Sequence, residues 1–115
     1  GFVERRAELL ARAARDQLAD CTVTLPALVA RGASASIHLW FAGLDGLRAE
    51  LFPRARGAYE SWRRGDGGNA LVAAAADGTM HWKRVCDTVL ALAGRGGSDA
   101  EGAIAALAMA GATRL

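Results

Sequence analysis

The chain alternates between segments with apolar residues at helical spacing and short segments rich in glycine. In residues 2–19, apolar side chains such as Val3, Ala7 and Leu10 recur every three or four positions, which predicts an amphipathic helix. Many of the apolar positions are alanine, the strongest helix former. The pattern therefore predicts an all-α fold of about six short helices in antiparallel pairs, forming one small domain over residues 1–115.

Local start and stop signals divide the first half of the chain. Thr24 is expected to cap a short helix over 25–31. The apolar run within 37–52 is interrupted by glycine, so we expect two helices with a turn near 44–46. Residues 57–68 are polar and glycine-rich, and we expect them to form a loop.

The second half is expected to contain three helices separated by glycine. We predict that Asn69 caps a short alanine-rich helix, which ends at Gly78 as its C′ residue. A longer apolar helix then follows from about Trp82 to Ala93. A last helix is expected over 99–110.

An α+β fold is the alternative to the all-α prediction. Asp77-Gly78 is a common hairpin turn, and residues 70–76 and 79–85 could flank it as strands. The successive alanines at 73–76 favour helix over strand, because alanine is depleted in strands.

Part of the chain resembles the ankyrin repeat. Residues 67–78 resemble the pattern G-x-T-A-L-x-x-A-A-x-x-G, and residues 85–90 resemble the V-V-x-x-L-L of the second ankyrin helix. The Arg-Gly-Ala triplets at 31–33 and 56–58 resemble the triplet that closes a repeat. The resemblance covers about residues 47–94, and it implies degenerate ankyrin-repeat-like helix pairs.

Aromatic and arginine side chains gather in the predicted loop. Tyr59, Trp62, Arg63 and Arg64 lie together there, and Trp, Tyr and Arg are the residue types enriched at interaction hot spots. We therefore predict a non-enzymatic protein-interaction module that binds a protein partner through these four residues.

A second hypothesis is a small-molecule or anion-binding domain, with catalysis as one option. Gly67, Gly68 and Asn69 open a predicted helix, and Arg63 and Arg64 precede them. Backbone N–H groups at a helix start, beside two guanidinium groups, could bind a phosphate or a carboxylate.

A DNA-binding regulator is the third hypothesis, and the charge argues against it. The net charge is only +2, so we do not expect nucleic acid to be the main partner. Lys83 is the only lysine among many arginines. This bias, with the abundant alanine, indicates a GC-rich coding sequence and a composition of bacterial type.

The remaining chemistry-bearing residues form no recognisable motif. Cys21 and Cys86 make no CxxC, and neither His38 nor His81 lies at metal-ligand spacing from a cysteine. We expect no catalytic residue, metal or cofactor, and we leave the roles of these four residues and the oligomeric state open. The two cysteines are expected to be reduced thiols in a cytoplasmic protein without a membrane segment.

Overall fold

The described residues form seven α-helices, a π-helix and a short 3-10 helix. The computed structural model describes residues 1–115, apart from the side chain of Ser98. None of the described residues lies in a strand, so the all-α prediction is confirmed and the hairpin alternative is wrong. The elements are α1 (Phe2–Ala19), η1 (Asp20–Thr24, the π-helix), α2 (Leu25–Ala30), α3 (Ser34–Ala42), α4 (Gly46–Leu51), α5 (Pro53–Arg63), α6 (Asn69–Arg95), α7 (Ser98–Leu107) and η2 (Gly111–Thr113, the 3-10 helix).

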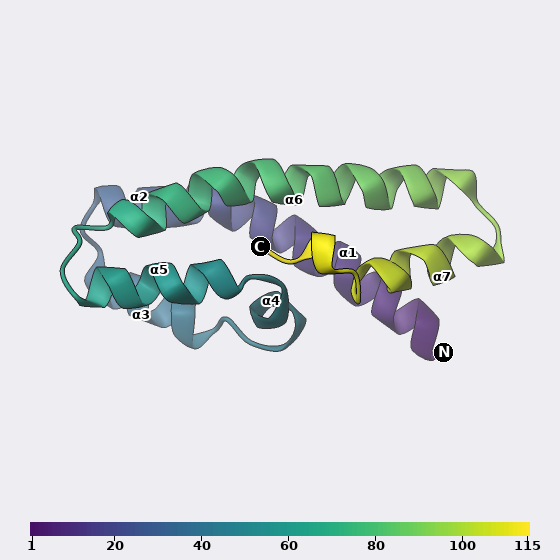
Figure 1. The fold of residues 1–115 in the computed structure, drawn as a ribbon, viewed down its shortest axis with the longest axis horizontal. Coiled ribbons are helices and arrows are strands. Elements are labelled where there is room, and N and C mark those ends of the chain that lie inside the picture. Colours follow the sequence, from purple (N-terminus) through teal and green to yellow (C-terminus); the bar gives the residue numbers. More distant parts are fainter.

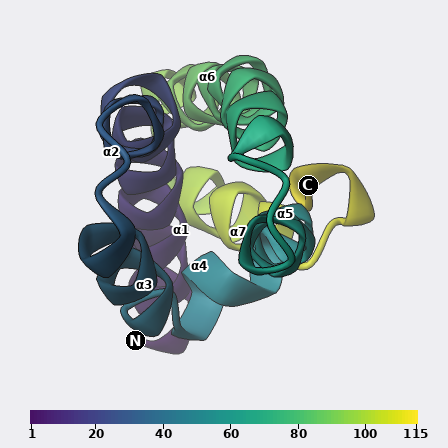
Figure 2. The same ribbon diagram turned by 90° about the vertical axis from the view of Figure 1, so that its left-hand side faces the viewer.

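Helix α6 runs along the whole length of the elongated molecule (Figure 1), which measures 49 × 22 × 21 Å. Helix α5 packs antiparallel to its first half and α7 packs antiparallel to its second half, while α1 lies behind α6 and α7. Viewed from the end, α1, α3, α5 and α6 surround a common interior (Figure 2), which their apolar side chains fill. The predicted antiparallel pairing therefore holds for the helices that precede and follow α6.

The first three elements form one continuous helical stretch. The predicted cap at Thr24 is wrong: its φ of −64° and ψ of −57° are helical, and its side chain makes no cap hydrogen bond. Instead of stopping, the helix widens into the π-helix η1 and narrows again into α2. Such π segments occur mostly as short insertions within α-helices.

The predicted loop over 57–68 is also wrong for most of its length. Residues 57–63 belong to α5, which begins at Pro53, a residue favoured at the first position of a helix. Ala55 and Ala58 face the core and are buried, so tertiary packing stabilises this otherwise polar segment. Only the turn at 64–68 lies outside a helix.

Gly78 does not end a helix, which is the largest departure from the prediction. It lies inside α6, which is 27 residues long and replaces the short helix and the longer helix predicted on either side of this glycine. A Cβ atom at Gly78 would overlap the Sγ of Cys21 and would come within 3.3 Å of the Phe52 ring. This glycine therefore serves a close helix contact and not a turn.

The core is built where α6 meets its neighbours. Trp82 and Phe52 are fully buried, and their ring centroids lie 5.8 Å apart. Val85 and Val89 continue the same buried face of α6, as the sequence predicted. Of the described helices, none combines the length and the apolar character that crossing a bilayer requires.

Replacing Gly78 with alanine should destabilise the fold by about 1–2 kcal/mol, because overpacking outweighs the roughly 1 kcal/mol gained in helix propensity. Chemical denaturation followed by circular dichroism measures the change. The control is Gly57→Ala in α5, where a Cβ would meet no atom within 4 Å.

Gly57→Ala should be neutral or stabilising, since only the propensity gain applies there. Adding Cys21→Ala to the Gly78 variant should recover part of the loss, because the sulfur is the atom that the new Cβ meets first. Equal stabilisation by both glycine replacements would show that α6 and η1 are not in close contact.

Candidate functional site

Helices α3 and α5 bring four ring side chains together in an aromatic cluster. We call His38, Phe41, Tyr59 and Trp62 the α3–α5 aromatic cluster. His38 and Phe41 lie one turn apart on α3, and Tyr59 and Trp62 lie one turn apart on α5, so each pair shares one face of its helix.

Hydrogen bonding and ring contacts fix the geometry of the cluster. The Nδ1 of His38 lies 2.6 Å from the hydroxyl oxygen of Tyr59. The His38 ring packs edge-on against the Trp62 ring, with their centroids 4.8 Å apart. The Tyr59 ring stacks on the rings of both Phe41 and Trp62, with centroid distances of 4.2 Å and 5.9 Å respectively. Aromatic pairs in these arrangements contribute beyond the area that they bury.

The cluster extends from the core to the surface. Phe41 is buried, Tyr59 and Trp62 are half-buried, and His38 is exposed. The two aromatic residues predicted for partner binding therefore combine a structural contact with an accessible edge. His38 was not predicted to join them, because its contact with Tyr59 depends on how α3 packs against α5.

The two arginines predicted for binding lie at the C-terminal end of α5. Arg63 is exposed, its guanidinium lies 5.7 Å from the centre of the Tyr59 ring, and it pairs with Glu60 at 3.5 Å. Arg64 is exposed and forms the C-cap of α5. The structure thus places Arg63 directly beside the aromatic cluster.

The start of α6 already holds a carboxylate from the protein itself. The side chain of Asp66 accepts hydrogen bonds from the N–H groups of Gly68, at 2.7 Å, and Ala70, at 3.0 Å. Asn69 is the first residue of α6 and not its cap, and Gly68 precedes it with φ of +96°. The anion-binding hypothesis relied on Gly67, Gly68 and Asn69, and at Gly68 the donor that it needs is occupied by Asp66.

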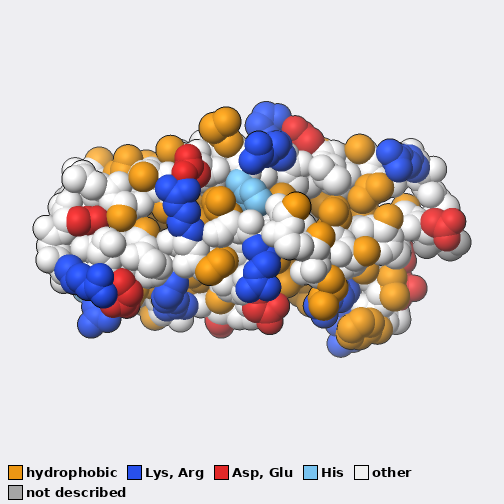
Figure 3. All heavy atoms as spheres, in the orientation of Figure 1, with side chains coloured by type: hydrophobic (Ala, Val, Ile, Leu, Met, Phe, Trp, Pro, Cys, Tyr) orange, Lys and Arg blue, Asp and Glu red, His pale blue; other side chains and the backbone are white. Residues whose placement is uncertain are grey.

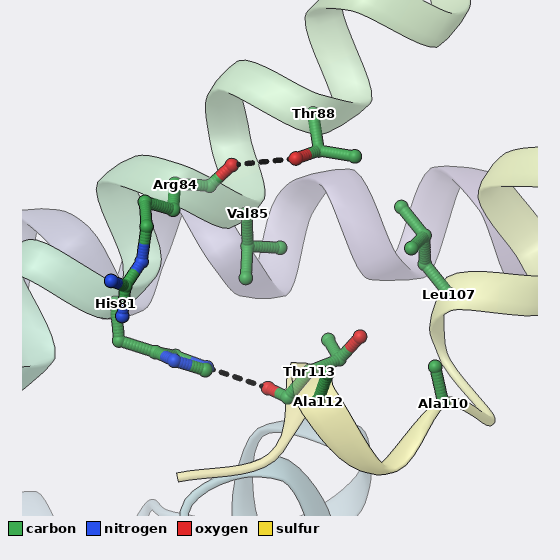
Figure 4. A pocket seen from close by; sticks show the side chains of 8 residues that line it. All are labelled: His81, Arg84, Val85, Thr88, Leu107, Ala110, Ala112 and Thr113. Carbon is green, nitrogen blue, oxygen red and sulfur yellow. Dashed lines mark hydrogen bonds between the residues drawn. The ribbon is translucent and has the colours of Figure 1, made fainter.

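A cavity of about 370 Å³ lies between α6, α7 and the C-terminal segment (Figure 4). Its walls are mostly apolar or carry short side chains. His81 donates its Nε2 proton to the carbonyl of Thr113 at 2.7 Å, and the Thr88 hydroxyl donates to the carbonyl of Arg84 at 2.9 Å. Two of its polar side chains therefore stabilise the backbone around the cavity. The lining residues are His81, Arg84, Val85, Thr88, Leu107, Ala110, Ala112 and Thr113.

Neither cysteine has the environment of a reactive thiol. Burial raises the pKa of Cys21 to about 12, and the neighbouring Asp20 carboxylate adds to the increase. Burial also raises the pKa of Cys86, with a further contribution from Asp87. Since the thiolate is the nucleophile, these pKa shifts keep both side chains protonated at neutral pH.

A comparison with protein families shows which family the chain belongs to. Residues 1–111 match the model of the C-terminal domain of a family of unknown function (DUF6866). The chain belongs to this family. A search of curated proteins and a search of solved structures each found no match.

The family match leaves the ankyrin resemblance as a prediction. Within this DUF6866 domain, however, the helix pair that the resemblance requires around Gly78 is one continuous helix, α6. Asn69 lies at the start of a helix, as the ankyrin-like pattern predicts. The turn that the same pattern predicts at Gly78 is replaced by continuous helix.

Removing the Asp66 carboxylate should cost about 1–2 kcal/mol of stability, as for other helix caps, because two N–H groups lose their acceptor. Urea denaturation of Asp66→Ala measures this loss. The control is Asp45→Ala, since Asp45 precedes α4 without a side-chain cap hydrogen bond and should matter less.

Sulfate provides the second arm of this test. We expect sulfate to stabilise Asp66→Ala more than the wild-type domain, because the substitution frees the donors at the start of α6. A stronger effect of sulfate on the wild type would instead favour the anion-binding hypothesis.

Proposed function

We propose that this domain is a non-enzymatic protein-interaction module, and that the α3–α5 aromatic cluster with Arg63 and Arg64 is its contact surface. The observation that carries the proposal is the coupled arrangement of His38, Tyr59 and Trp62. Their half-buried and exposed rings are held from two helices by one hydrogen bond and several ring contacts.

A surface of this kind suits protein recognition because it is pre-organised. Side chains already fixed by internal contacts lose little conformational freedom when a partner binds. Trp, Tyr and Arg combine a large apolar area with hydrogen-bonding groups, which is why they dominate interaction hot spots. The accessible edges of Tyr59 and Trp62 would supply the apolar contact, and Arg63 would supply the polar rim.

The charge of this surface indicates the chemistry of the partner. Arg63 shares its charge with Glu60, while no ion pair is formed by Arg64 among the described residues. We therefore propose a protein partner that offers an apolar side chain to the rings and a carboxylate to Arg64. A bidentate contact with a carboxylate is the geometry that guanidinium groups favour.

The cytoplasmic location belongs to the same proposal. Cys21 and Cys86 are both free thiols, as expected in a reducing compartment.

The cavity beside His81 favours the small-molecule alternative. Its volume lies within the range typical of ligand pockets, although its residues are not those predicted from the sequence. The DNA-binding hypothesis stays a prediction, with the modest charge of +2 against it.

The double variant Arg63→Ala with Arg64→Ala should weaken partner binding by about 2 kcal/mol, or roughly thirtyfold, without loss of folding. Both side chains are exposed, so thermal melting should be nearly unchanged. The partner can be identified with a photo-crosslinking residue at position 63 and then titrated in purified form by calorimetry.

The control uses arginines at the opposite end of the molecule. Arg5 lies in the first turn of α1 and Arg95 is the last residue of α6, and these two helix ends lie at the end of the molecule away from α3 and α5 (Figure 1). Both side chains are exposed, so the double alanine variant at these positions removes the same charge. It should bind like the wild type. Identical crosslinks from positions 63 and 95, or wild-type affinity in the Arg63/Arg64 variant, would disprove this contact surface.

A further inference from the structure

The face of α6 that points away from the core has its own regular pattern. Along it, exposed residues follow one another at alternating spacings of three and four, which is the spacing of a helix–helix seam. This stripe lies on the side of the helix opposite Val85 and Val89, which face the core. We call it the α6 outer stripe. Its residues are Ala73, Ala76, Met80, Lys83, Asp87, Leu90 and Gly94.

Two large apolar side chains in the stripe are left without cover. Met80 is 66% exposed and Leu90 is 70% exposed. Along the upper edge of Figure 3, where α6 lies, hydrophobic side chains are visible on both sides of a charged group. The remaining stripe residues other than Lys83 and Asp87 are alanine or glycine, which allow another helix to approach closely.

Residues at equal distances on either side of position 85 in the stripe are complementary to one another. Counting outward from position 85, Met80 corresponds to Leu90 and Lys83 corresponds to Asp87. Ala76 corresponds in the same way to Gly94. Two antiparallel copies of α6 could be related by a two-fold axis beside position 85. Large apolar side chains would then face large apolar side chains, positive charges would face negative charges, and small residues would face small residues.

We propose that the α6 outer stripe is the interface of an antiparallel homodimer. A two-fold axis uses the same surface on both copies, so the surface must be complementary to itself, as this one is. The occupant of the stripe is thus a second copy of this chain. The proposal does not depend on the α3–α5 aromatic cluster, which lies on other helices.

The central charges select the antiparallel direction. Within one chain, Lys83 Nζ lies 3.1 Å from the Oδ2 of Asp87. In the antiparallel dimer each of these groups also faces the opposite charge on the other copy. A parallel dimer would set lysine beside lysine and aspartate beside aspartate, and like charges in contact oppose association.

The available length is enough for a helix pair. Centred on position 85, the two copies of α6 would overlap over about 20 residues, or roughly 30 Å at 1.5 Å per residue. Only two large apolar side chains from each copy lie in the seam, so we expect a dimer that dissociates on dilution.

Sedimentation velocity across a range of protein concentrations tests the proposal. The wild-type domain should shift from monomer to dimer as concentration rises. Lys83→Glu and Asp87→Lys should each weaken self-association by about tenfold or more, because each sets like charges against each other across the axis. Leu90→Ser should also weaken it, through loss of apolar contact.

Mixing the two charge variants is the decisive measurement. In the mixed dimer, Glu at position 83 of one copy faces Lys at position 87 of the other, and Asp87 of the first faces Lys83 of the second. Association should therefore return to near the wild-type level. The matched control is Arg12→Glu on α1, which disrupts a similar exposed pair with Glu8, at 3.3 Å, and should leave self-association unchanged.

Three results would overturn the proposal. These are a wild-type domain that stays monomeric at every concentration, charge variants that associate like the wild type, and a mixture that fails to recover association. Circular dichroism on each variant verifies that folding is intact, as expected for exposed positions.

Discussion

The close approach of η1 to α6 at Gly78 joins the N-terminal helices to the centre of the fold. Because Gly78 has no side chain, the Cys21 sulfur and the Phe52 ring can both reach the backbone of α6. One turn further along, Trp82 packs edge-on against Phe52. The N-terminal helices and the α4–α5 junction are thus held against the middle of α6.

The π-helix η1 also helps to position α3, which carries part of the aromatic cluster. Asp20, its first residue, accepts a hydrogen bond from the indole N–H of Trp40 at 3.1 Å and another from Arg48 at 3.3 Å. The side chains of Asp20 and Arg48 are both partly shielded, so this pairing is stronger than one at the open surface. It fixes α3 and α4 relative to the N-terminal helices, and Trp40 lies next to Phe41 of the aromatic cluster.

The two proposed contact surfaces lie on different helices, one on α6 and the other on α3 and α5. Its inner face packs against α1, η1, α5 and α7 and supports the core. Its outer stripe faces solvent over most of the length of the molecule, while the aromatic cluster lies on α3 and α5 at one end. Because no residue belongs to both surfaces, a dimer through α6 leaves the cluster free, and one domain could associate with itself and with a partner at once.

Local sequence signals are enough to predict the helical class, the extent of α1, and the buried face of α6 at Trp82, Val85 and Val89. These features follow from propensity and periodicity, which are properties of neighbouring residues. The sequence also brought together Tyr59, Trp62 and Arg63 as neighbours in the chain, though it predicted a loop where the structure has a helix.

The roles of several glycines and polar side chains depend instead on how the helices pack. In a sequence, a glycine before a polar residue indicates the end of a helix. At Gly78, however, the sulfur of Cys21 occupies the space that a side chain would need, and the helix continues. Likewise, Asp66 in place of Asn69 caps α6 because the turn at 64–68 directs its carboxylate to the N–H groups. His38 joins Tyr59 only when α3 meets α5. In each case the role depends on atoms from a distant segment or on the path of a turn, which local sequence signals do not encode.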